Sequence, residues 1–172
     1  MLGGSTQGYY WRDYTGMIPE DAVEGGHDKN NIPTYIGQVY VHNFGISTVT
    51  IYPGKTCVTL SVENFDVWNY IKILCSPFKE NFKWVSADAK RLHVQMTGKH
   101  LVPGGVEWNG LVTNIGRILY QGELLVAKVC GFNVGNAKLY YRIGNGQKDT
   151  DYYEILTYDD DGPDPGSIIQ PR

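Results

Sequence analysis

The 172-residue chain lacks the features that mark membrane proteins and disulfide-stabilised proteins. Gly, Lys or Glu interrupts every apolar run well before the roughly 18–20 residues that a membrane-spanning helix needs. The chain has only three cysteines, Cys57, Cys75 and Cys130, with no Cys-x-x-Cys spacing, and it has no Asn-X-Ser/Thr glycosylation site. We therefore expect no transmembrane segment and a reducing compartment, in which the thiols are buried as small apolar side chains.

Charge is also sparse, since 15 basic and 18 acidic residues give a net charge of −3. There is no excess of Lys and Arg to neutralise phosphates, so we expect no nucleic-acid partner. Residues 1–14 contain neither the basic nor the apolar segment of a secretory signal. The sequence predicts a cytoplasmic protein, with vesicle association or release without a signal peptide as further options.

Patterns that carry catalysis are missing as well. The chain has no Gly-x-Ser-x-Gly, no Gly-x-Gly-x-x-Gly after a predicted strand and no Walker loop. Its acidic residues do not cluster as an oxygen cage for calcium. The histidines lack metal-ligand spacing with one another and with the cysteines; they are His27, His42, His93 and His100. We therefore expect a protein that is not an enzyme and that uses no metal or cofactor.

Glycine (21 residues) and tyrosine (13 residues) are abundant, and apolar residues recur with period two. This alternation covers residues 58–62, 67–73, 92–96 and 139–143, with turn-forming residues between the runs. Such spacing predicts an all-β fold, an antiparallel sandwich or barrel-like unit. Residues 85–91 form the single helix candidate, and a loop suits them better.

The chain also contains an internal repeat, which organises this fold. Three pairs of segments match in order, with a tryptophan before each copy (Trp11 and Trp84): 18–24 with 102–107, 35–40 with 114–120, and 70–74 with 153–156. We assign repeat one to about residues 9–76 and repeat two to about residues 82–158, within one domain over residues 1–158. Repeats of this size are expected to share a core. Residues 159–172 are acidic and rich in Pro and Gly, which predicts a flexible tail.

The order of these elements resembles the DM-nine repeat family of insects, molluscs and other animals. The resemblance covers residues 11–156 and rests on a tryptophan followed by Ile-Pro-x-x-Ala-Val-x-Gly-Gly, Tyr-Ile-Gly, Pro-Gly-Lys and Tyr-x-Ile-Leu. It implies two repeats in a β-sandwich-like unit, often a dimer, and in characterised members a mannose-binding lectin. Insect members are associated with responses to infection. Some members are labelled farnesoic acid O-methyltransferase-like, but an all-β chain lacks the glycine-rich α/β cofactor site that such an enzyme needs.

The resemblance also points to site residues. In mannose-binding members, an acidic residue after the Gly-Gly turn and the lysine of Pro-Gly-Lys contact sugar hydroxyls, which corresponds to Asp28 and Lys55 here. His27 adjoins Asp28 and is a further candidate. Each charge-assisted hydrogen bond to a hydroxyl contributes about 1.5–3 kcal/mol. From the residues alone, Asp28 is a turn residue and Lys55 a solvated lysine at the end of a strand.

Repeat two departs from this pattern. Lys128 matches Lys55, whereas Leu111 or Gly110 stands where Asp28 would be. We therefore expect one competent sugar site, in repeat one, with Lys128 as a weaker candidate. The resemblance therefore implies a non-catalytic lectin for mannose-type glycans, a homodimer with a role in innate recognition of microbes. The alternatives are a structural or protein-interaction module and an enzyme acting on an isoprenoid acid.

Overall fold

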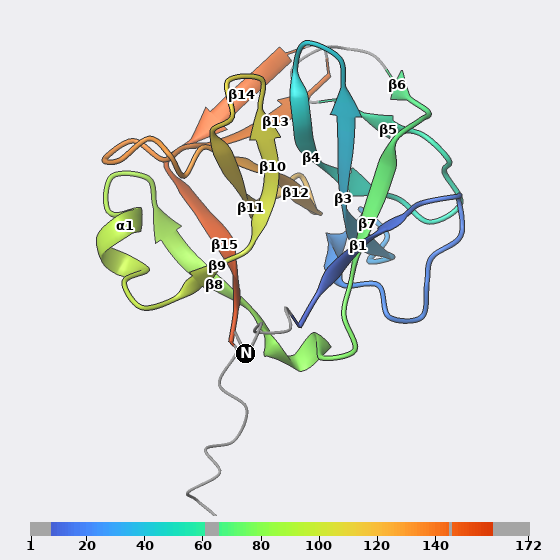
Figure 1. The fold of residues 1–172 in the computed structure, drawn as a ribbon, viewed down its shortest axis with the longest axis horizontal. Helices are drawn as coiled ribbons and strands as arrows, with labels where there is room; N and C mark the ends of the chain where they lie inside the picture. Colours follow the sequence, from blue (N-terminus) through green and yellow to red (C-terminus); the bar gives the residue numbers. More distant parts are fainter. Residues whose placement is uncertain (1–7, 61–65, 145, 160–172) are drawn as a thin grey trace, which may run out of the picture.

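The computed structural model describes residues 8–60, 66–144 and 146–159 (Figure 1). The first half contains β1 (Tyr10–Asp13), β2 (Glu24–His27), β3 (Pro33–Val41), β4 (Gly45–Ile51), β5 (Val58–Thr59), β6 (Asp66–Val67) and β7 (Ile71–Cys75), followed by the 3-10 helix η1 (Lys79–Asn81). The second contains β8 (Phe82–Asp88), α1 (Leu92–Gln95), β9 (His100–Leu101), β10 (Pro103–Glu107), β11 (Val112–Tyr120), β12 (Glu123–Val129), β13 (Leu139–Ile143), β14 (Gly146–Thr150) and β15 (Tyr152–Tyr158). The strand pairs are antiparallel, which confirms the predicted all-β class.

Six strands close into a hydrogen-bonded ring to which both halves contribute. β2, β3 and β4 come from the first half, and β10, β11 and β12 come from the second. The ring closes where β4 pairs with β10, with Ile46 opposite Val106, and where β12 pairs with β2, with Leu124 opposite His27. Neither half supplies all the strands of the ring, so each half depends on the other for two of its backbone edges.

The strand pairing follows the same scheme in both halves. Gly37 of β3 pairs with Ile73 of β7, and Gly116 of β11 pairs with Ile155 of β15. The outer strands β1 and β8 then pair with β7 and β15. Positions on β3 and β11 therefore correspond at a separation of 79 residues.

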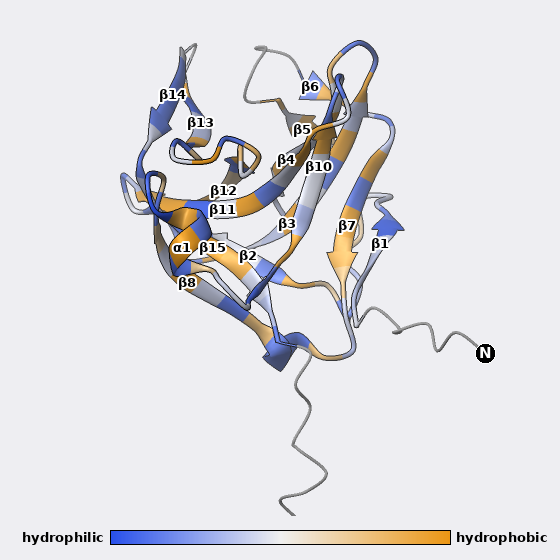
Figure 2. Ribbon diagram, turned by 60° about the vertical axis from the view of Figure 1, so that its left-hand side comes forward, coloured by the Kyte–Doolittle hydropathy of each residue, from blue (hydrophilic) through white to orange (hydrophobic). Residues whose placement is uncertain are grey.

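Apolar side chains gather in three buried clusters. One belongs to the first half around Ile51 and Ile73, and a second belongs to the second half around Val129 and Ile155. The third draws on both halves, and its buried members are Tyr9, Val23, Ile36, Leu74, Val102, Ile115, Val126, Leu156 and Tyr158. Figure 2 shows both hydrophobic and hydrophilic residues along β7 and β11. In β7, Ile73, Leu74 and Cys75 are buried one after another, so both faces of this part of the strand are covered.

One predicted strand is a helix in the structure. Residues 92–96 were expected to be extended, but α1 spans Leu92–Gln95. Leu92 and Met96 are buried and Val94 is exposed, because residues four apart lie on one face of a helix and the intervening Val94 does not. A period-two pattern this short fits both structures. The loop favoured at 85–91 was wrong for residues 85–88, which belong to β8, whereas residues 89–91 form a turn.

The predicted strand at 67–73 is interrupted. Val67 ends β6, whereas Ile71 begins β7, and Tyr70 between them has a φ of 59°. A bulky residue in this left-handed conformation breaks a strand. The Ser61–Val62 part of the predicted strand at 58–62 lies outside the described residues, as does the predicted tail apart from Asp159.

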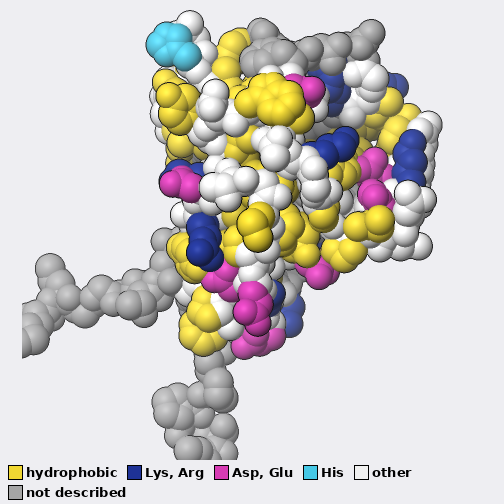
Figure 3. Space-filling model, turned by 90° about the vertical axis from the view of Figure 1, so that its right-hand side faces the viewer, with side chains coloured by type: hydrophobic (Ala, Val, Ile, Leu, Met, Phe, Trp, Pro, Cys, Tyr) yellow, Lys and Arg dark blue, Asp and Glu magenta, His cyan; other side chains and the backbone are white. Residues whose placement is uncertain are grey.

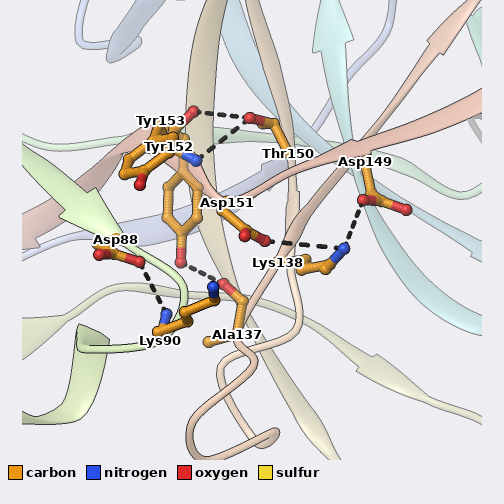
Figure 4. A network of polar contacts seen from close by, with 9 residues as sticks. All are labelled: Asp88, Lys90, Ala137, Lys138, Asp149, Thr150, Asp151, Tyr152 and Tyr153. Carbon is orange, nitrogen blue, oxygen red and sulfur yellow. Dashed lines mark hydrogen bonds and ion pairs between the residues drawn. The ribbon is translucent and has the colours of Figure 1, made fainter.

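Polar contacts fasten the strands at the far end of the second half (Figure 4). The Lys138 ammonium lies 2.8 Å from Asp149 Oδ1 and 3.7 Å from Asp151 Oδ1. The Tyr153 hydroxyl donates to the carbonyl of Ala137. These contacts join the segment before β13 to β14 and β15. No helix in the described part of the chain has the length and apolarity needed to cross a membrane.

We predict that Gly105→Ala opens the ring. A Cβ at Gly105 would lie 2.0 Å from the carbonyl oxygen of Ile46 on β4, a backbone contact that cannot rotate away. Chemical denaturation should show a loss of about 2–3 kcal/mol in the free energy of unfolding. Gly146→Ala is the control, because a Cβ there would meet only Ile143 O at 3.8 Å, and its effect should stay within about 0.5 kcal/mol. Equal stabilities for the two variants would contradict this account.

Candidate functional site

Asp28 and Lys55 line the same cavity, which has a volume of about 720 Å³ and which we call the first cavity. Its walls come from both halves. Tyr52 and Lys55 follow β4 in the first half, whereas Glu123 of β12 and Arg142 of β13 come from the second. The structure thus brings together the two residues that the resemblance singled out, and it adds charged groups that sequence reasoning did not identify.

Asp28 holds the turn that follows β2. Its backbone N–H donates to the carbonyl of Ile32 at 2.9 Å. Its Oδ1 accepts hydrogen bonds from the N–H groups of Asn30 (2.8 Å) and Ile32 (2.9 Å). Within residues 8–60, 66–144 and 146–159, Oδ2 has no hydrogen-bond partner. One oxygen therefore stabilises the turn, as the simplest interpretation of the sequence predicted, and the other is available to a ligand.

Lys55 lies beside Tyr52 in the next wall of the cavity. The Lys55 ammonium is 5.2 Å from the centroid of the Tyr52 ring, a cation–π contact. The Tyr52 hydroxyl donates to the carboxylate of Glu123. No carboxylate of the described residues forms an ion pair with Lys55. The ammonium therefore keeps hydrogen-bond donors for a ligand.

The pKa of Tyr52 is raised above its ordinary value of 10.0. Burial is the largest cause, followed by the hydrogen bond to Glu123 and by the negative charges of Glu123 and Asp28. Burial and nearby carboxylates both disfavour a phenolate. Tyr52 is therefore a neutral donor to Glu123 over the physiological pH range, which fixes the orientation of that carboxylate in the cavity wall.

His27 lies beside the site without lining the cavity. Its Nδ1 is 2.9 Å from the carbonyl oxygen of Asp28, and its backbone is opposite Leu124 where β2 meets β12. The ring thus supports the turn that carries Asp28. This places His27 in a structural position next to the candidate site.

Lys128 lies in a separate cavity of about 270 Å³, the second cavity, lined also by Glu107, Trp108, Phe132 and Tyr140. Lys128 is buried, and its ammonium donates to Glu107 Oε1 at 2.6 Å. The stability of an ion pair between two partly desolvated groups depends on its geometry and on hydrogen bonds to the remaining donors and acceptors. Because Lys128 lines a different cavity from Asp28 and Lys55, it does not contact a small ligand that is bound between those two residues.

The structure corrects the predicted match of Asp28 with Leu111 or Gly110. Glu107 N–H donates to the carbonyl of Leu111 just as Asp28 N–H donates to that of Ile32. Glu107 is therefore the counterpart of Asp28, and it keeps the separation of 79 residues. The predicted match was wrong because Ile18-Pro19 was paired with Val102-Pro103 at a separation of 84 residues, whereas Gly25-Gly26 and Gly104-Gly105 occupy equivalent positions at a separation of 79.

The predicted match of Lys128 with Lys55 is also wrong. The N–H of Lys55 donates to the carbonyl of Tyr52, and the N–H of Asn133 donates to that of Cys130 in an equivalent turn. Asn133 thus occupies the position of Lys55. Lys128 pairs with Ile115 on β11 as Thr50 pairs with Ile36 on β3, so Lys128 is the counterpart of Thr50.

The cysteines are free thiols. Cys75 and Cys130 are buried, whereas Cys57 is partly exposed and lines the first cavity. Burial is the main cause that raises the pKa of the Cys75 thiol, to about 12, so this thiol is inert at neutral pH. Among the residues that the structure describes, no three His, Cys, Asp or Glu side chains are grouped to hold a metal ion.

Charges of both signs mix on the surface. On the face shown in Figure 3, Lys and Arg side chains lie among Asp and Glu side chains and hydrophobic ones instead of forming one patch. That face therefore lacks the single-sign field that draws a polyelectrolyte to a protein.

The fold defined here is an antiparallel all-β unit in which two similar halves share a closed ring of strands. It is similar to the crystal structure of the nematode sperm cell motility protein MFP2B, with a TM-score of 0.55 and 13% sequence identity. The match covers 94% of this chain and 47% of that one, so this chain spans about half the length of MFP2B. No protein-family model and no curated protein sequence matches the chain.

We predict that Tyr52 makes stability fall above pH 10. The pKa of Tyr52 is raised on folding, so its contribution is fully present below the unfolded pKa of about 10 and is lost as pH rises toward the folded value. Urea unfolding between pH 9 and 11 gives the free energy of unfolding as a function of pH. For Tyr52→Phe this free energy should fall less steeply with pH than for the wild type, by up to about 1.4 kcal/mol per pH unit. Tyr152→Phe, at an exposed tyrosine, should keep the wild-type slope. The prediction is wrong if Tyr52→Phe also shows the wild-type slope.

Proposed function

We propose that the protein is a non-catalytic lectin that holds a mannose-type glycan in the first cavity. The observation that supports this most directly is that Asp28 and Lys55, 27 positions apart in the sequence, line one cavity. A carboxylate oxygen without a partner and an ammonium outside any ion pair in the described chain are both available there. Such a pair suits a ligand that is rich in hydroxyl groups.

The chemistry of recognition follows from these groups. Asp28 Oδ2 accepts from a sugar hydroxyl, while the Lys55 ammonium donates to a hydroxyl or ring oxygen. Because the turn holds Asp28 and the Tyr52 ring lies beside Lys55, neither group needs large rearrangement on binding. Glu123, which accepts a hydrogen bond from Tyr52, offers a further acceptor in the part of the cavity wall that comes from the second half of the chain.

One open polar site gives weak binding. We expect a dissociation constant for a monosaccharide on the order of millimolar, about −4 kcal/mol. A homodimer that presents two sites to a glycan surface would raise avidity by about 10²–10⁴ without new contacts. The proposed role is therefore recognition of mannose-rich surfaces, such as those of microbes, by an assembled form of the protein.

The second candidate is a protein-interaction module without sugar binding. The likeness of fold to a sperm cell motility protein favours it, as does the exposure of Trp68 and of Tyr40 and Tyr70, whose rings meet edge to face. Capture of one defined protein partner by the purified chain, together with silence on a glycan array, would favour this function over the lectin.

We predict that Asp28→Asn weakens binding to mannan by at least about tenfold, the loss expected for one charge-assisted hydrogen bond. Asparagine keeps the Oδ1 that accepts from Asn30 and Ile32, so the turn survives while the charge on the free oxygen is lost. Lys55→Met should have a similar effect, because it keeps the side-chain stem beside Tyr52 and removes the donors.

Retention on mannan-agarose and a glycan array provide the measurement. Lys72→Met is the matched control, since Lys72 on β7 is exposed and pairs with Asp13 outside the first cavity. Binding by Lys72→Met should equal that of the wild type. Wild-type binding by Asp28→Asn or by Lys55→Met would remove that residue from the site.

A further inference from the structure

The second cavity is the counterpart of the first in the other half, but it is built from different side chains. Its turn carries Glu107 in place of Asp28, and Trp108 in place of Lys29. Cys130 stands where Tyr52 stands in the first cavity. The two equivalent places in the fold therefore hold cavities of different chemistry: the first cavity is more polar and the second is mainly apolar.

In the described chain, the Glu107 carboxylate does not accept hydrogen bonds from the backbone of its own turn, as the Asp28 carboxylate does. The N–H of Leu111 donates to Asn109 Oδ1 at 3.2 Å, so the Glu107 carboxylate is not needed to hold this turn. It reaches Lys128 instead, at 2.6 Å. Lys128 is 8% exposed, and burying an ammonium at this position is costly unless its donors are used.

The charges of the second cavity cancel. Glu107 and Lys128 are the charged side chains among its described lining residues, and they neutralise each other. An anion or a cation entering the cavity would have to compete with this pair and would leave one member unpaired. The pair still offers two further ammonium donors and a second carboxylate oxygen to a neutral polar group.

The remaining lining is mixed: the apolar and aromatic side chains are Phe44, Leu60, Cys130, Phe132 and Tyr140, and the polar ones are Ser47, Asn109 and Gln147. Trp108 borders the same cavity and is 76% exposed, and an indole this exposed next to a cavity is a surface that a flat ligand would cover. The exposed lining is mainly apolar, which favours a ring with few polar groups over a hexose with its many hydroxyls. The volume of about 270 Å³ is below that of cavities for drug-sized ligands.

We propose that the second cavity binds a small neutral aromatic molecule that carries one carboxamide or phenol group. The ring packs against Trp108 and Phe132, and the polar group accepts from Lys128 and donates to Glu107. This inference does not depend on the lectin function, since it uses none of the residues of the first cavity.

Titration of the ¹⁵N-labelled full chain with benzamide, followed by NMR, tests the proposal. Saturable shifts are expected at the backbone amides of Lys128 and Cys130 and at the indole N–H of Trp108. Benzoate and benzylammonium, which have the same ring and a charge, should bind at least about tenfold more weakly, as should methyl α-mannoside. Absence of saturable shifts with benzamide at these residues would overturn the proposal, as would equal or tighter binding of benzoate or of the mannoside.

Variants separate the ligand site from folding. Trp108→Ala changes an exposed side chain and should weaken benzamide binding by roughly tenfold without changing the thermal midpoint. The double variant Glu107→Gln/Lys128→Met removes both charges together, which avoids an unpaired buried charge, and should also weaken benzamide binding. Asp28→Asn should bind benzamide like the wild type. Unchanged benzamide binding by Trp108→Ala and by the double variant would assign the shifts to another part of the surface.

Discussion

Backbone pairing between the two halves is the constraint on which the rest of the structure depends. The ring closes because Gly26 and Gly105 have no side chain where β2 meets β12 and β10 meets β4. At each glycine, a Cβ would lie 2.0 Å from a carbonyl oxygen of the neighbouring strand, on Leu124 and Ile46 respectively. Two equivalent close contacts thus allow each half to complete the sheet of the other, and the shared apolar cluster stabilises the same junction.

This closure also explains why functional groups come from both halves. The first cavity combines Asp28 and Lys55 with Glu123, which reaches it only because β12 pairs with β2. Arg117 shows the same coupling, since its guanidinium stacks 4.2 Å from the Trp84 ring, pairs with Glu154 and donates to the carbonyl of Gly25 in the first half. A scaffold of two linked halves can therefore keep its closure while the two cavities diverge in chemistry.

Several parts of this arrangement could be predicted, and the limits of prediction have physical causes. Alternation at 139–143 indicated a strand, because side chains on strands alternate between faces. The paired glycines were predicted to form turns, but Gly25-Gly26 lies in β2 and Gly104-Gly105 lies in β10. The same alternation at 92–96 was misleading, because Leu92 and Met96 also share a face of a helix. The match of Glu107 to Asp28 was missed because Ile18-Pro19 was paired with Val102-Pro103; pairing Gly25-Gly26 with Gly104-Gly105 would have placed Glu107 opposite Asp28.

The sequence by itself determined the all-β class, the antiparallel strands and the candidate pair of Asp28 and Lys55. These follow from local steric preferences, from the period of hydrophobic burial and from a motif resemblance. Only the tertiary structure decided that Tyr52 donates to Glu123 and that Lys128 pairs with Glu107. The partners in these contacts are 71 and 21 residues apart. Their meeting depends on which strands and turns become neighbours when the ring closes, and no local property of the chain encodes that choice.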